Sequence, residues 1–204
     1  MPGNNSRQIP DVADNIEKQD AYRRTLGRFN KAKKEGFFLE AMWILYAMME
    51  DRTTAFLYYA GFTDEKNRTN PANKVKSDIR IILKIADGKN ISGFNTLAVK
   101  LDTISKILAW AKTAGSLSGY KQDLQTRIIK KVKIPELQAA LIAMDDWRDF
   151  RNQIVHALFD KKAGEVRDRL ERLVNDGFNA IRVLDNAVKA LKSGTNIRIQ
   201  YNIQ

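Results

Sequence analysis

Hydrophobic residues in this chain recur mainly at spacings of three and four positions, the period of an amphipathic α-helix. The clearest case is residues 37–60, where this spacing joins Phe37, Ala41, Ile44, Leu45, Met48, Ala55, Phe56 and Tyr59. A second apolar line in the same segment runs through Phe38, Met42, Trp43, Met49 and Leu57. One stripe is enough to dock a surface helix, so we expect this helix to be covered on two sides, by the core and by a dimer partner.

The same period predicts six further helices, at residues 11–34, 75–86, 97–112, 120–132, 135–159 and 164–192. For residues 75–86 a strand is the alternative, because several of the apolar residues are β-branched. Clusters of Gly, Asn, Thr, Ser and Pro separate the segments and predict loops. The pattern as a whole predicts an all-α fold, a bundle of about five to seven helices.

The length of 204 residues suits one domain. We expect a disordered N-terminus over residues 1–10, a single helical domain over 11–193 and an extended tail over 194–204. In the tail, apolar and polar residues alternate, a pattern that favours a short strand or a segment lying along a partner.

The composition narrows the classes of site that the chain can form. The absence of cysteine excludes disulfides and thiolate metal sites, and the single histidine excludes a multi-histidine zinc cage. We therefore predict no metal and no cofactor. The first residues lack the regions of a signal peptide, and no stretch approaches the ~20 apolar residues that span a bilayer. We expect a cytoplasmic protein without membrane contact.

The formal charge is +11 and the isoelectric point is about 9.8. Such an excess of positive charge favours polyanionic partners such as nucleic acids. Candidate RNA-binding residues crowd one short segment: Arg127, Lys130, Lys131 and Lys133. The alternative is that these side chains form an ordinary solvated surface.

Residues 135–159 carry the most suggestive side chains. On a helical wheel Arg151 falls within the apolar arc, whereas Asp145, Asp149, Asn152 and His156 share the polar arc. A buried arginine requires a partner. That partner is either an ion pair with Glu40 or Glu50, or a ligand such as a phosphate. Histidine is the residue type best suited to proton transfer at neutral pH, and His156 is the only one in the sequence.

The string Arg151-Asn152-Gln153-Ile154-Val155-His156 resembles the Rx4-6H signature of HEPN domains, and Glu50-Asp51-Arg52 resembles an early helix of several HEPN families. The architectural resemblance covers about residues 37–192. It implies a helical bundle that forms a homodimer with two motifs in one cleft. Many HEPN proteins are metal-independent endoribonucleases, often toxins or antiphage effectors, and others are catalytically silent modules that bind nucleic acid or proteins.

The resemblance also implies roles for individual residues. His156 would act as general acid or base, Arg151 would hold the scissile phosphate, and Asn152 would orient the imidazole or bind a phosphate oxygen. Glu50 and Asp149 are candidate supporting residues. In a straight helix Arg151 and His156 diverge by about 140°, so they converge only through a bend, a long reach of the arginine, or a site shared between protomers.

One departure from the family concerns regulation. Where HEPN toxins paired with a nucleotidyltransferase antitoxin commonly carry a modified tyrosine, two residues past the histidine, this chain has Leu158. We still expect control by an antitoxin or another regulatory protein, but we do not expect it to act through that tyrosine modification.

Overall fold

The computed structural model describes residues 15–86, 89–113, 115, 117–157, 163–194 and 196–203. Within these ranges the chain forms helices and no named strand, which confirms the all-α fold. The elements are α1 (Asn15–Lys34), α2 (Phe38–Tyr59), the 3₁₀ turn η2 (Asn73–Val75), α3 (Lys76–Ile82), α4 (Leu97–Ala111), α5 (Gly119–Lys131), α6 (Ile134–Ala157), α7 (Ala163–Lys192) and α8 (Ile197–Gln200).

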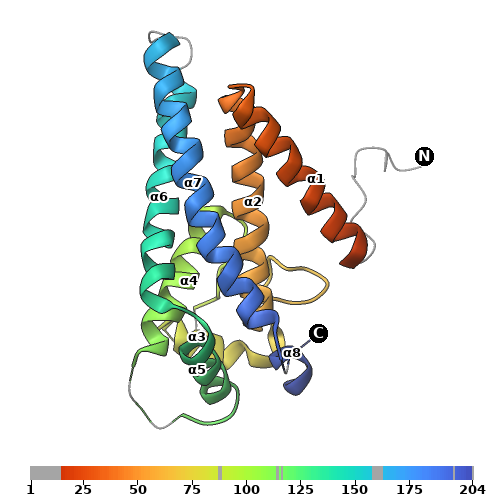
Figure 1. Cartoon of the computed structure of the whole chain (residues 1–204). Helices are drawn as coiled ribbons and strands as arrows, with labels where there is room; N and C mark the ends of the chain where they lie inside the picture. Colours follow the sequence, from red (N-terminus) through yellow and green to blue (C-terminus); the bar gives the residue numbers. More distant parts are fainter. Residues whose placement is uncertain are drawn as a thin grey trace, which may run out of the picture.

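The long helix α7 organises the bundle, since it packs against both α2 and α6 (Figure 1). On the other sides of α2 lie α1, which crosses it obliquely, and α4. The shorter helices α3, α5 and α8 close one end of the bundle. No helix in the described part of the chain is both long and apolar enough to cross a membrane.

Helix α2 is covered on two sides, as its two apolar lines predicted. Its side chains at Met42, Leu45, Met49 and Phe56 are fully or almost fully buried. The covering elements belong to the same chain, namely α7, α1 and α4. One part of α2 is left uncovered, because Trp43 remains half exposed. The internal cover therefore accounts for most of the second apolar line, and Trp43 is the exception.

Two predicted segments differ from the structure. The helix expected over residues 75–86 is shorter, because α3 ends at Ile82 and Lys84 takes a positive φ of 54°. The tail expected to be extended contains α8 instead. The amide oxygen of Asn196 accepts a hydrogen bond from the backbone N–H of Arg198 and so caps this turn. The predicted N-terminal disorder of residues 1–10 lies outside the described residues.

Burial explains why the tail is not a strand. Ile197 and Ile203 are buried, whereas Ile199 between them is 79% exposed. The buried Arg198 anchors the turn through a 2.7 Å hydrogen bond from its Nη1 to the carbonyl oxygen of Thr63. The alternating apolar and polar residues of the tail therefore fit a single helical turn that packs on the bundle. With this turn the described ranges contain eight α-helices, one more than the upper end of the prediction.

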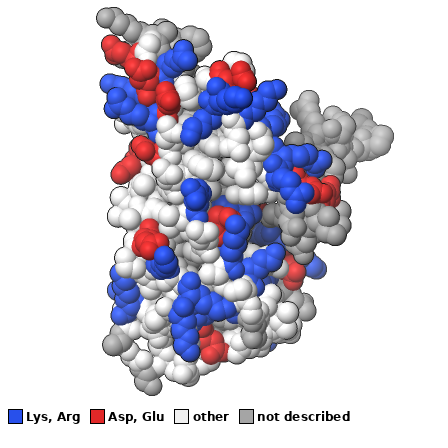
Figure 2. All heavy atoms as spheres, in the orientation of Figure 1, with Lys and Arg blue, Asp and Glu red and all other residues white. Residues whose placement is uncertain are grey.

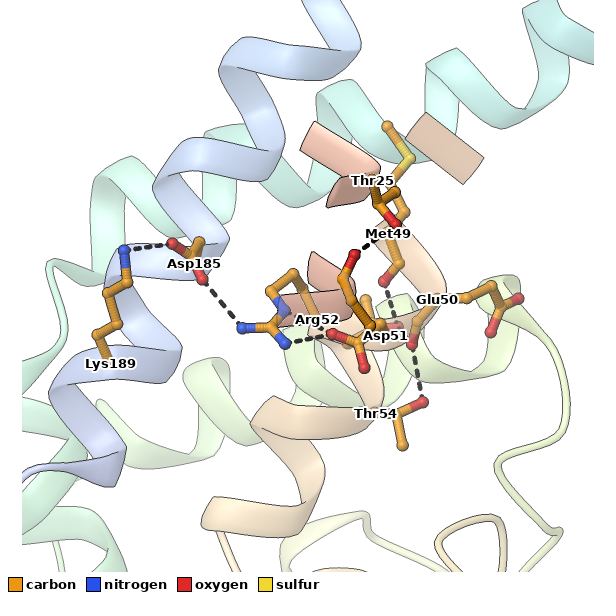
Figure 3. A network of polar contacts seen from close by, with 10 residues as sticks. Thr25, Met49, Glu50, Asp51, Arg52, Thr54, Asp185 and Lys189 are labelled. Carbon is orange, nitrogen blue, oxygen red and sulfur yellow. Dashed lines mark hydrogen bonds and ion pairs between the residues drawn. The ribbon is translucent and has the colours of Figure 1, made fainter. Parts of the chain in front are cut away.

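A polar network inside the bundle joins α2 to α7 (Figure 3). The guanidinium of Arg52 is bonded to its neighbour Asp51 and, at 3.1 Å, to Asp185 of α7. It also lies 4.8 Å from the ring centre of Tyr22 on α1. Burial opposes the charged form of Arg52, but the carboxylates outweigh this and raise its pKa above the ordinary value. Arg52 therefore ties three helices together.

The close approach of α7 to α6 depends on a glycine. A Cβ atom at Gly177 would lie 2.5 Å from Nε1 of Trp147, a buried indole whose N–H donates to the carbonyl oxygen of Leu173. We predict that Gly177→Ala lowers the free energy of unfolding by about 1–2 kcal/mol, because overpacking outweighs the gain in helix propensity. Urea unfolding measures the change.

The matched control is Gly27→Ala in α1. A Cβ atom at Gly27 meets nothing within 4 Å. This substitution is expected to stabilise the protein by about 0.4–1 kcal/mol, since it restricts the unfolded chain without strain. If both variants were stabilised, the steric role of Gly177 would be refuted.

Candidate functional site

Arg151 of α6 lies over two aromatic rings of α2. Its guanidinium carbon is 4.4 Å from the ring centre of Tyr46 and 5.7 Å from that of Trp43. The two rings meet edge to face, with centres 6.3 Å apart and planes at 88°. A cation over an aromatic face is attracted by the ring quadrupole. The aromatic rings thus take the place of the carboxylate partner that the apolar setting of Arg151 led us to consider.

The two glutamates considered as ion-pair partners of Arg151 are engaged elsewhere. Glu40 pairs with Arg28 at 3.0 Å, and Glu50 pairs with the buried Lys100 of α4. Among the described residues, therefore, the ion pair between Arg151 and Glu40 or Glu50 is not formed. The physical reason is that α1 and α4 supply cations on the sides of α2 where these carboxylates lie.

Glu50 nevertheless supports the site through Tyr46. The Tyr46 hydroxyl donates a 3.2 Å hydrogen bond to Glu50, so the phenol is held between a carboxylate and the Arg151 guanidinium. Burial and then the negative charge of Glu50 raise the pKa of Tyr46, while Arg151 opposes the shift. The chain of contacts from Lys100 through Glu50 and Tyr46 to Arg151 couples α4, α2 and α6.

Arg151 also reaches round its own helix. Its Nε and Nη2 donate to the amide oxygen of Asn152 at 3.2 and 2.6 Å. Asn152 and His156 are four residues apart on α6, so their side chains share one face, and both are exposed. The guanidinium is therefore drawn toward the face that carries His156. This contact bears on one of the three ways in which the arginine and histidine could converge, the reach of the arginine, and it ends at Asn152.

Asp149 is placed differently. Its carboxylate pairs with the adjacent Arg148 at 3.0 Å, and Arg148 also pairs with Asp145 at 3.2 Å. The side chain of Asp149 is 62% exposed. These contacts hold Asp149 in a surface ion pair along α6, and its recorded partner is Arg148 rather than Arg151.

The candidate RNA-binding residues lie on α5 and in the short link to the first residue of α6, at a distance from this site. At about 1.5 Å of rise per residue, Arg151 is roughly 25 Å along α6 from its first residue. Arg127 donates to the carbonyl oxygens of Leu191 and Ser193, and Lys131 also bonds to Ser193. These two cations satisfy the carbonyl-rich C-terminus of α7. Lys130 is exposed, and Lys133 is an exposed partner of Glu136.

Figure 2 shows Lys and Arg in several separate clusters, with acidic side chains among them, on the face that it presents. On this face the positive charge is therefore distributed rather than concentrated in one patch.

Two grooves accompany the helices that carry the site. A groove of about 580 Å³ between α1 and α2 is lined by Thr25, Arg28, Leu39, Glu40, Trp43, Ile44 and Ala47. It shares Trp43 with the Arg151 site. A second groove, of about 940 Å³ between α6 and α7, is lined by residues that include Trp147 and Phe150 but neither Arg151 nor His156. The first groove is therefore the one that continues from the site.

Trp43 and Tyr46 were not among the site residues that the sequence predicted. Trp43 stood on the second apolar line of α2, and a spacing of three places Tyr46 beside it. That pairing was the available indication. What it could not show is that α6 brings Arg151 over these two rings.

The fold and the site define an all-helical bundle with an arginine, an asparagine and a histidine on one helix, backed by two aromatic rings of another. No group of three or more potential metal ligands occurs among the described residues. Comparison of the chain with family models, curated proteins and solved structures finds no match.

Proposed function

We propose that this protein is a HEPN-type, metal-independent endoribonuclease. The supporting observation is the bond from the Arg151 guanidinium to Asn152, which draws the cation toward the face of α6 that carries the exposed His156. Cleavage of RNA through its 2′-hydroxyl needs a cation that stabilises the charge on the phosphate and groups that transfer protons, and Arg151 and His156 are residues of these two types.

In the proposed reaction the ribose 2′-oxygen attacks phosphorus and the 5′-oxygen leaves. One group removes the 2′ proton and another donates a proton to the leaving oxygen, so the products are a 2′,3′-cyclic phosphate and a 5′-hydroxyl. Arg151 neutralises the negative charge that develops on the phosphate oxygens. His156 supplies one of the two proton transfers.

The other proton transfer is assigned to a second protomer. Each chain has a single histidine. A homodimer that brings two motifs into one cleft would supply both an acid and a base. Mixing wild type with an excess of His156→Ala protein tests this arrangement. Subunit exchange then gives heterodimers with one histidine in the cleft, so the activity per wild-type chain should fall, whereas independent sites would keep it constant.

The first experiment is incubation of end-labelled total RNA with purified protein in EDTA. The expected result is cleavage that EDTA does not inhibit, with cyclic phosphate and 5′-hydroxyl ends. Loss of cleavage on chelation would refute the mechanism even if RNA were the substrate. A His156→Ala preparation purified in the same way controls for contaminating nucleases.

We further propose a cytoplasmic role as a toxin or as an antiphage or stress effector, held in check by an antitoxin or another regulatory protein. Expression of the wild type should then arrest bacterial growth, and expression of His156→Ala should not. Arrest by both variants would separate toxicity from RNA cleavage.

The alternative is a non-catalytic HEPN-like module that binds RNA or a protein. It is favoured by the two hydrogen bonds that the Asn152 amide oxygen accepts from Arg151, because that oxygen is then not placed to orient His156. This alternative predicts RNA binding that survives His156→Ala and no cleavage of any RNA.

A further inference from the structure

Trp43 is unusually exposed for its residue type. Its side chain is 50% exposed, whereas Trp110 and Trp147 are 7% and 3% exposed. Leu39, one turn earlier on α2 and in the same groove, is also exposed, as is Phe37 directly before the helix. Exposed apolar side chains that gather in one place usually mark a binding surface. This surface lies directly beside Arg151.

The indole of Trp43 is held in a defined orientation. Its ring stands edge to face with Tyr46, and the Tyr46 hydroxyl is in turn bonded to Glu50. Because Glu50 is also paired with the buried Lys100, the aromatic pair rests on a fixed polar support. A half-exposed ring held in this way offers a flat surface at little cost in conformational entropy.

Two cations belong to the surroundings of this ring. The Arg151 guanidinium is 5.7 Å from its centre. The groove between α1 and α2, which Trp43 also lines, contains Arg28. The Arg28 side chain is 75% exposed, and its ion pair with Glu40 is an exposed one, so a phosphate can replace the glutamate at small cost.

We propose that Trp43 stacks an unpaired base of single-stranded RNA, with the flanking phosphates bound by Arg151 on one side and Arg28 on the other. The proposal rests on the proposed function in one respect, that Arg151 holds the phosphate to be cleaved. The aromatic face is open to any base, whereas a duplex keeps its bases stacked on one another. The site thereby selects single strands, and the base on Trp43 sets the position of cleavage.

A second copy of the chain could also cover Trp43, but the charge of the surface favours the nucleic acid. Arg151 lies near the ring, Arg28 lines the same groove, and the chain as a whole carries a charge of +11. Two such surfaces in direct contact would repel each other, whereas RNA in a cleft between two protomers would neutralise both. The combination of an aromatic ring with two cations near it matches a base with its flanking phosphates.

The test is the binding of an unlabelled single-stranded RNA of twelve adenosines, measured by tryptophan fluorescence in EDTA with His156→Ala protein. Trp43 is the solvent-accessible indole, since the other two tryptophans are buried. Stacking is expected to quench its emission. Trp43→Ala in the same background should weaken binding by about 5- to 150-fold, the factor that stacking of one base on an aromatic side chain contributes. Anisotropy of a labelled strand measures this affinity.

Two variants control for indirect effects. Trp43→Phe retains an aromatic face and should keep most of the affinity. Ile81→Ala removes another exposed apolar residue, on α3, and should change nothing. Arg28→Ala should weaken binding and reduce the salt dependence by about one phosphate contact.

The proposal is overturned if Trp43→Ala binds the single strand as tightly as the parent protein does. It is overturned too if the substitution weakens the binding of a duplex of the same length by the same factor. It is also overturned if the variant changes the oligomeric state in light scattering while RNA affinity stays the same, since a second copy would then occupy the surface. Failure of the proposed ribonuclease is distinguishable: Trp43-dependent binding without any cleavage by wild type would preserve this inference alone.

Discussion

Replacement of His156 by alanine is expected to reduce RNA cleavage by about 100- to 10,000-fold, the range typical for the loss of one general acid or base. His156 is exposed on the last turn of α6 and shares a face with Asn152, so its removal should disturb no buried packing. The affinity for single-stranded RNA should therefore remain within a few-fold of wild type. Initial rates of cleavage in EDTA measure the effect.

The control for this substitution is Gln153→Ala. Gln153 lies between Asn152 and His156 in the sequence and is exposed on α6. The variant should cleave RNA at the wild-type rate. Equal cleavage by His156→Ala and Gln153→Ala would exclude His156 from the reaction.

The largest expected effect on stability belongs to Arg52. We predict that Arg52→Ala lowers the free energy of unfolding by about 2–4 kcal/mol, because it leaves the poorly hydrated carboxylate of Asp185 and the partly exposed carboxylate of Asp51 without their shared cation. Arg52 and Asp185 are only 15% and 14% exposed, and Asp51 is the other partner. The remaining bond from Lys189 to Asp185, at 2.6 Å, keeps the loss below that of a fully unpaired buried charge.

Arg28→Ala is the matched control for this effect. Its ion pair with Glu40 has a similar length but is 75% and 44% exposed, so its loss should cost at most about 1 kcal/mol. Urea unfolding of both variants, followed by circular dichroism, gives the comparison. Similar losses in the two variants would show that burial does not strengthen the Arg52 network.

Most of the helices could be predicted from the sequence because their apolar faces are long enough to repeat the helical period several times. Helices α2, α4 and α7 are examples, and each begins and ends within a few residues of its predicted range. The short elements could not be predicted in this way. The tail has too few residues to show a period, and the cap at Asn196 and the burial of Ile197 and Ile203 decide its conformation.

For the candidate site, too, the sequence predicted what depends on spacing within one helix and did not predict contacts between helices. By itself the sequence determined the all-helical class and the placing of Asn152 and His156 on one face of one helix, because both follow from residue spacing within a segment. Only the tertiary structure decided the partner of Arg151. From the sequence of α2, Glu50 was as plausible a partner as Tyr46. In the structure Lys100 of α4 pairs with Glu50, and the aromatic rings of Tyr46 and Trp43 contact the arginine instead. The partner of Arg151 depends on which helices pack together, and the residue spacing within a single helix carries no information about that packing.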